Sequence, residues 1–404
     1  MTSPDHLSKQ QEPSSVVTIS ATSAENLMTP IGNQPTSTGN YIHDVWSTSL
    51  YQQCRPFLIL LRLGGLFFIH PGSGPITTHN KIHDATSPTR VSNSHKNSPK
   101  IWERFERFSI VYSFVVLLIC LAFAAKFLYS IIYGISGLPF TQANLSVIVS
   151  HFSYMAWITQ INISQIIFLR ACLSPSRLPE LFMKWEYLRY PCPVKECSAP
   201  SFGKDFRWRR NVVSFFAVLH CVLQWMSTDF GLIIPSKEYD GLRGALMEGF
   251  AWNETAIIVL NFIGGMMTSF VYVVPAYFFT LIAVTLTIDF HHLRHDLHES
   301  VKDDGIITIK SLEWFRIRHN CLCVLVDMAD AVFSPWIALT LGCNVLQILS
   351  QIFLFAATAS HWTVITDLTQ LYWMMTFFQQ LLIILYRGAL VNEAVKCCLF
   401  RLFG

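Results

Sequence analysis

The sequence predicts an all-α membrane protein, a polytopic helical bundle with six visible spans and a cytosolic N-terminus. Of its 404 residues, 52% are hydrophobic and only 14% are charged, whereas a soluble domain carries about 25% charged residues. The apolar residues also gather in runs long enough to cross a bilayer. These observations exclude an ordinary cytosolic enzyme, a nucleic-acid-binding protein and a fibrous protein. The net charge of +3 is too small to indicate a polyanionic partner.

Six segments each hold the roughly 20 apolar residues that a membrane-spanning helix needs. In lipid, every backbone amide must be paired within its own segment, so each segment is expected to be a helix. The predicted spans are 108–133, 145–169, 211–234, 256–288, 331–359 and 363–386. The fourth span is interrupted by Gly264, Gly265 and Pro275, which predicts close helix packing or a hinge there.

The chain before these spans divides into three parts. Residues 1–50 are polar and show no periodicity, so they are expected to form a disordered cytosolic N-terminus without a cleaved signal peptide. Residues 51–70 hold an apolar stretch too short to cross about 30 Å of lipid, which predicts an interfacial or re-entrant helix. Residues 71–100 favour turns and predict a flexible linker. The helical bundle is assigned to residues 101–404.

The distribution of Lys and Arg orients the predicted bundle, because these residues concentrate on the cytosolic side. The basic loop 170–210 holds nine of them and the long helical loop 289–330 holds five, whereas 134–144 holds none. Both basic loops and the N-terminus are therefore predicted to be cytoplasmic, in a multi-pass protein of the cell membrane. Glycosylation sequons at Asn144 and Asn253 fall in or beside the predicted outer loops, so a glycoprotein is expected.

Several segments carry a family resemblance. They are 56–68 (PFLILLRLGGLFF), 272–297, 315–339 and 386–396 (YRGALVNEAVK). The third fits a spaced pattern, R-x-x-[HY]-x-x-L-x-x-L-V-x-x-x-D, which is filled by Arg316 or Arg318, His319, Leu322, Leu325, Val326 and Asp330. Over residues 50–400 the chain resembles the insect gustatory receptors, within the arthropod gustatory and odorant receptor superfamily. The sugar-receptor branch is the most similar.

The resemblance implies a gustatory receptor, a subunit of a ligand-gated cation channel that detects sugars or bitter compounds. It further implies a homo- or hetero-tetramer in membrane lipid, a small-molecule tastant as ligand and no cofactor. The family's seventh, pore-lining span with its T-Y-x-x-x-x-x-Q-F signature is not found before Gly404. A truncated, non-conducting receptor or accessory subunit is therefore one alternative. A multi-pass transporter is another, although no inverted repeat is visible between the halves.

A ligand site is predicted in the outer third of the bundle, where aromatic and polar residues gather within the spans. Intramembrane polar groups are costly and face protein or water, and aromatic walls with a few polar groups suit small ligands such as sugars. The alternative is that these groups only bond to one another between helices. The candidate residues are Tyr154, Trp157, Trp225, Asp229, Gln347, Gln351, Asp367, Gln370 and Trp373.

Other chemistry has little support in the sequence. No GxSxG, HExxH, Walker or GxGxxG motif is present, so no enzyme activity is predicted. His291, His295 and His298 share one predicted helical face and could offer imidazoles to zinc, but they are better explained by a cytosolic extension of the helix. Cys397 and Cys398 are juxtamembrane, where palmitoylation or free thiols are both possible.

Overall fold

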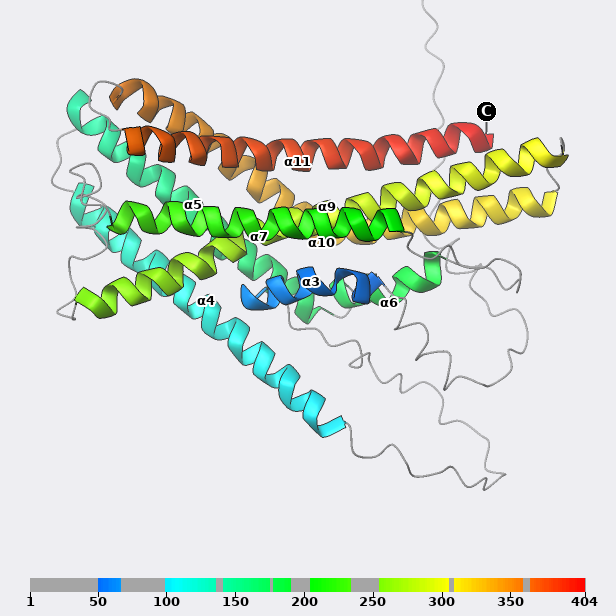
Figure 1. Cartoon of the computed structure of the whole chain (residues 1–404), viewed down its shortest axis with the longest axis horizontal. Helices are drawn as coiled ribbons and strands as arrows, with labels where there is room; N and C mark the ends of the chain where they lie inside the picture. Colours follow the sequence, from blue (N-terminus) through cyan, green and yellow to red (C-terminus); the bar gives the residue numbers. More distant parts are fainter. Residues whose placement is uncertain are drawn as a thin grey trace, which may run out of the picture. The chain divides into compact units, whose positions relative to one another are not determined.

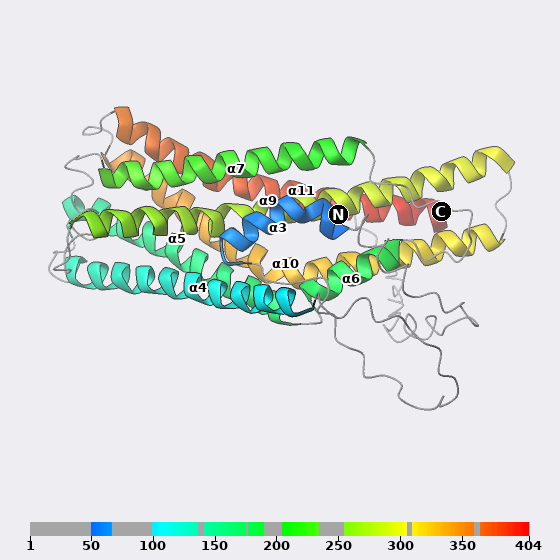
Figure 2. The same ribbon diagram turned by 60° about the horizontal axis from the view of Figure 1, so that its bottom comes forward.

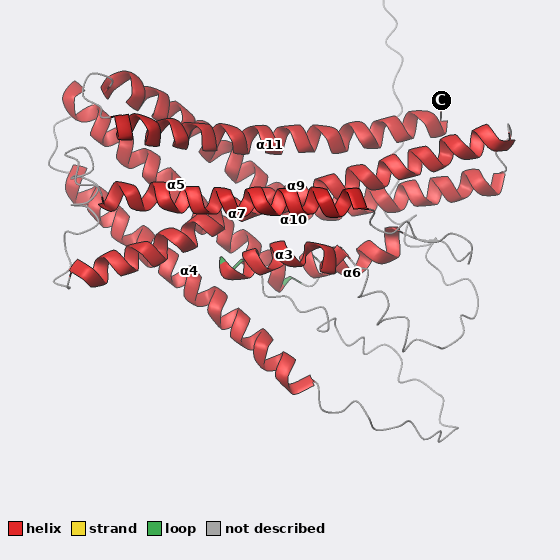
Figure 3. Ribbon diagram, in the orientation of Figure 1, coloured by secondary structure: helices red, strands yellow, loops and turns green. Residues whose placement is uncertain are grey.

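The computed structural model describes residues 50–66, 99–135, 141–174, 177–189, 204–233, 254–304, 309–358 and 364–403. Every regular element among these residues is a helix (Figures 1 and 3). The helices are α3 (Leu50–Leu63), α4 (Pro99–Ile135), α5 (Gln142–Leu173), α6 (Leu178–Arg189), α7 (Lys204–Ile233), α9 (Glu254–Asp304), α10 (Ile309–Thr358) and α11 (Val364–Phe403). The N-terminal segment 1–49 and the greater part of the predicted linker lie outside the described residues.

Five described helices are long and apolar enough to cross a membrane, and each overlaps one of the six predicted spans. Their apolar segments are Phe108–Ala125, Asn144–Leu173, Phe262–Val301, Ser311–Ala357 and Leu368–Cys398. The remaining predicted span is α7, a helix of 30 residues, about 45 Å long at 1.5 Å per residue. It exposes Phe215 and Phe216, but His220 and Gln224 interrupt its apolar run, and it is not among the five.

Two helices extend well beyond the thickness of a bilayer. The helix α9 has 51 residues and α10 has 50, so each is about 75 Å long, against a hydrocarbon core of about 30 Å. The two helices pack against each other. The helix α9 reaches Asp304 and α10 begins at Ile309, so each extends into the region 289–330 that was expected to be a helical loop (Figure 2). Within the loop 170–210, the structure contains the additional helix α6.

The helix α9 is the centre of the bundle. It packs against α7, α11, α10 and α3, and nearly all side chains between Val271 and Leu286 are buried. A helix that is apolar all round must be covered on all sides. The outer helices instead expose apolar side chains, such as Leu118 on α4 and Leu382 on α11. An apolar outer surface around a buried central helix is the arrangement expected for a bundle in lipid.

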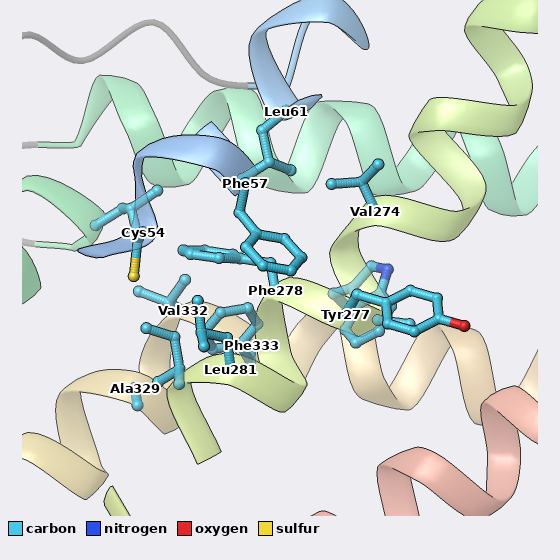
Figure 4. Packing of buried hydrophobic residues seen from close by; sticks show 14 of the residues in the cluster. Cys54, Phe57, Leu61, Val274, Tyr277, Phe278, Leu281, Ala329, Val332 and Phe333 are labelled. Carbon is cyan, nitrogen blue, oxygen red and sulfur yellow. The ribbon is translucent and has the colours of Figure 1, made fainter. Parts of the chain in front are cut away.

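The short helix α3 is packed into this bundle. Its Phe57 is fully buried and lies against Phe278 of α9 and Phe333 of α10 (Figure 4). After its last turn, Gly65 has φ of +68°, and the Leu66 N–H donates to the Leu61 carbonyl at 2.7 Å. Together with the Gly65 N–H to Arg62 carbonyl bond, this is a Schellman motif.

Neighbouring helices hold the end of α3 in place. The Tyr112 hydroxyl of α4 donates to the Leu63 carbonyl at 2.8 Å, and the Cys172 thiol of α5 lies 3.4 Å from the Leu66 carbonyl. Backbone carbonyls without a helical partner are thus satisfied by side chains, as a helix end inside a bundle requires.

Candidate functional site

Four rings from three helices form a buried aromatic cluster. Trp157 of α5 lies edge-on to Trp373 of α11, with ring centroids 5.5 Å apart, and Tyr272 of α9 lies 6.4 Å from Trp157. Phe377 of α11 closes the group, 5.6 Å from Trp373 and 6.3 Å from Tyr272. Three of these pairs are edge-to-face and the Trp373–Phe377 pair is tilted, all at separations where aromatic rings attract one another. The Trp157 indole N–H is buried without a hydrogen-bond partner among the described residues.

A polar triad beside the aromatic cluster links α9, α10 and α11. The Tyr272 hydroxyl donates to Asn344 Oδ1 at 3.4 Å, and Asn344 Nδ2 donates to Gln380 Oε1 at 3.0 Å. Gln380 Nε2 then donates to the Tyr272 backbone carbonyl at 3.3 Å. Pro275 leaves the Val271 carbonyl without its helical donor, whereas Gln380 bonds to the Tyr272 carbonyl, so the triad links α9 to α11 rather than replacing the missing bond.

Two glutamines on one face of α10 bond to α5. Gln347 Nε2 donates to Gln160 Oε1 at 3.2 Å, and Gln351 Nε2 lies 3.5 Å from Ser153 Oγ. The carbonyl oxygens of both glutamines are buried and lack a hydrogen-bond partner among the described residues. These glutamines therefore link α10 to α5, and each keeps a side-chain carbonyl oxygen that can accept a further hydrogen bond.

A second polar cluster lies between α7, α9 and α11. His220 Nδ1 of α7 is 3.3 Å from the Tyr277 hydroxyl of α9, and Gln379 Nε2 of α11 donates to the same hydroxyl at 3.2 Å. His220 is buried, and its Nε2 has no hydrogen-bond partner among the described residues. One turn further along α7, the Trp225 ring packs edge-on against Phe262 of α9, with ring centroids 4.5 Å apart.

The second cluster has one hydrogen-bond donor without an acceptor among the described residues. If the Tyr277 hydroxyl donates to His220 Nδ1, the neutral imidazole carries its proton on Nε2, which is then an open donor. If His220 Nδ1 donates instead, Tyr277 accepts two bonds and its own proton has no acceptor among the described residues. In either tautomer, one donor of the His220–Tyr277 pair has no acceptor among the described residues.

The structure brings some of the candidate ligand-site residues together and leaves others apart. Trp157 and Trp373 are in direct contact. Gln347 and Gln351 both bond from α10 to α5. Tyr154 is half-buried and packs against the hydrophobic core, and Trp225 belongs to the α7–α9 contact. Gln370 of α11 has a buried carbonyl oxygen without a hydrogen-bond partner among the described residues. The remaining candidates, whose side chains lie outside the described residues, are Asp229, Asp367 and the sequon residue Asn253.

Sequence reasoning missed several residues of the two clusters. Tyr272, Phe377 and Gln380 complete the aromatic cluster and the triad, whereas His220 and Tyr277 form the second cluster. A histidine and a glutamine, His220 and Gln224, interrupt the apolar run of α7 at i and i+4, and this signal was available in the sequence. Because α9 is apolar on all faces, its pattern could not show which tyrosines face which neighbour.

These features define a helical membrane protein with buried aromatic and polar clusters between its central helices. The chain is similar to the insect olfactory receptor OR5 from Machilis hrabei, with a TM-score of 0.60 and 13% identity over 88% of this chain and 82% of that chain. It is also similar to the same receptor in complex with eugenol, with a TM-score of 0.51 and 14% identity over 90% of each chain. Comparison with family models and with curated protein sequences finds no match. The likeness shows the fold.

Proposed function

We propose that this chain is a chemosensory receptor of the gustatory and odorant receptor superfamily. Its bundle has the fold of an insect olfactory receptor over 88% of its length, which is the observation that carries the proposal. The gustatory branch is proposed from the sequence segments that resemble it, because the structural likeness does not distinguish taste from smell. Orientation with a cytoplasmic N-terminus in the cell membrane, and glycosylation at Asn144 and Asn253, belong to the same proposal.

The proposed ligand is a small organic molecule with an oxygen that can accept a hydrogen bond. The similar receptor has been solved with eugenol, a phenol with an aromatic ring and two oxygens. In this chain, His220 and Tyr277 offer an open donor. Trp225, five residues further along α7, packs edge-on against Phe262 of α9 and offers aromatic surface. Aromatic walls with few directed polar groups are how small-molecule sites obtain affinity and orientation. The neighbouring part of the same proposed site contains Trp157, Trp373, Gln347 and Gln351.

The proposed activity is ligand-gated cation conduction by a tetramer that contains this subunit. We expect cells that express the full chain to admit calcium when exposed to at least one of eugenol, sucrose and a bitter alkaloid. The response should depend on concentration, and His220→Ala should shift it to higher concentrations. Ser350→Ala is the matched control, because among the described residues the Ser350 hydroxyl bonds only to the Leu346 carbonyl of its own helix. A surface-expressed chain that responds to none of these compounds would contradict the conduction proposal.

Asp229 and Asp367 remain in the proposed site as acceptors for ligand hydroxyl groups. Asp229→Asn and Asp367→Asn should weaken the response without lowering surface expression, because an amide keeps the shape but loses the charge that strengthens a hydrogen bond. Unchanged dose–response curves for both variants would remove these carboxylates from the site.

A further inference from the structure

A group of exposed histidines lies on α9 where this helix extends beyond the predicted fourth span. The group, called here the α9 histidine group, consists of His291, His292, His295 and His298. On the opposite face of the same turns, Leu293 and Leu297 are buried in the core of the bundle. The leucines hold this part of α9 in place, whereas the histidine side chains face away from the core. Packing of the helical extension therefore does not explain the histidines.

His295 is the centre of the α9 histidine group. His291 and His292 precede it by four and three residues, and His298 and Glu299 follow it by three and four. Side chains at these separations are neighbours on a helix surface, with Cβ atoms about 5–6 Å apart. One such contact is formed, because His295 Nε2 lies 3.5 Å from Glu299 Oε1. Every pair of these imidazoles with a separation of three or four residues includes His295.

Two imidazoles at this spacing can bind one transition-metal ion. Imidazole nitrogens are good ligands for Zn²⁺, with bonds of about 2.0–2.1 Å. Two histidines four residues apart on one helix face hold zinc in other proteins. Among the described residues, no three or more side chains of His, Cys, Asp or Glu are arranged as a metal site. The arrangement here is therefore a pair of imidazoles on an exposed surface, where water completes the coordination of the ion.

We propose that the α9 histidine group binds one divalent transition-metal ion, represented by Zn²⁺, through His295 and one of its neighbouring imidazoles. The Glu299 carboxylate favours a cation at this position, because it brings negative charge next to His295. The two imidazoles of a pair can reach one ion only while the turn between them is helical. Bound metal therefore stabilises α9 over residues 291–299. This site does not depend on the proposed receptor function, because none of its residues belongs to the proposed ligand site.

Zinc titration of the purified full chain, prepared in detergent without a polyhistidine tag, tests the site by calorimetry. Accessible thiols are first alkylated with N-ethylmaleimide, because the 11 cysteines of the chain could also take up Zn²⁺. The wild-type chain should bind Zn²⁺ saturably. His295→Gln should weaken this binding on the order of 100-fold, because the helix holds the second imidazole at a high effective concentration. His291→Gln should weaken it only slightly, since two pairs that include His295 remain.

The matched control is His151→Gln on α5, which should bind Zn²⁺ as the wild-type chain does. The His151 ring bonds to the Val147 carbonyl of its own helix at 2.7 Å, and no other histidine lies within four residues of it. Because His295 is exposed and glutamine is a good helix former, the His295→Gln variant should fold normally. Equal affinity of this variant and the wild-type chain, or an absence of saturable binding, would overturn the site.

Hydrogen exchange measured by mass spectrometry locates the ion independently. Zn²⁺ should slow the exchange of backbone amides within 291–304 of the wild-type chain, because it stabilises these turns of α9. The same addition should leave exchange in this segment unchanged in His295→Gln. Slowing in other segments only, or equal slowing in the variant, would assign the bound zinc to other side chains and contradict the proposal.

Discussion

At the scale of single residues, buried polar side chains join the helices of this bundle. Asn344 is the clearest example, because it accepts from Tyr272 of α9 and donates to Gln380 of α11 while it lies on α10. The alternative that intramembrane polar groups only bond to one another describes this triad well. It does not describe His220 Nε2 or the Trp157 indole, which are buried without a hydrogen-bond partner among the described residues.

Asn344→Ala should therefore lower stability without acting on the open donors of the proposed site. It removes two hydrogen bonds between helices, each worth roughly 0.6 kcal/mol in a membrane bundle, so the expected loss is about 1 kcal/mol. The measurement is the thermal denaturation midpoint of the purified chain in detergent. Ser350→Ala, which affects only an intrahelical bond, should leave the midpoint in place. Equal midpoints for both variants would mean that the triad does not stabilise the bundle.

At the scale of elements, α3 is an integral part of the packing although it is only 14 residues long. Its buried side chains Cys54, Phe57 and Leu61 recur at a helical spacing, which places one face against α9 and α10 (Figure 4). The Schellman end and the Tyr112 bond define where the helix stops. A short apolar segment of this kind is stable because the bundle covers it, not because it spans lipid.

Phe57→Ala should detach α3 from the bundle. Truncating a fully buried phenylalanine costs about 3–5 kcal/mol, which exceeds what a short helix can supply alone. Limited proteolysis should then cut the chain near residues 50–66 much faster than in wild type. Ile59→Ala, on the exposed face of the same helix, should be cut at the wild-type rate, and rapid cleavage of both variants would refute the packing role.

The helices themselves follow from the sequence, whereas their partners do not. Apolar runs of sufficient length predicted α4, α5, α9, α10 and α11, because lipid permits only paired backbones. They could not predict that α10 packs along α5 or that α9 is central, because an apolar run carries no information on which face meets which helix. Trp157 and Trp373, which are in contact in the aromatic cluster, were candidates from the sequence because aromatic residues within a span stand out. Tyr272 and Tyr277 were missed because they are embedded in an apolar run.

At the scale of the whole molecule, the proposed topology makes a prediction that is independent of any ligand. An N-terminal epitope tag should react with antibody only after cells are permeabilised, because the basic loops 170–210 and 289–330 favour the cytosol. Asn144→Gln and Asn253→Gln should each shift electrophoretic mobility, because each removes a proposed glycan. A tag that is accessible on intact cells, together with unchanged mobility of both variants, would invert the proposed orientation.

The most direct measurement of the central claim is saturable binding of eugenol to the purified chain in lipid nanodiscs. Eugenol is the probe because a receptor of this fold has been solved with it. We predict saturable binding that Tyr277→Phe and His220→Ala each weaken about tenfold, because one of the two residues supplies the open donor and the other holds it in place through the His220–Tyr277 bond, while Ser350→Ala binds as wild type. Non-saturable uptake, or equal affinity in all three variants, would contradict a ligand site between α7, α9 and α11.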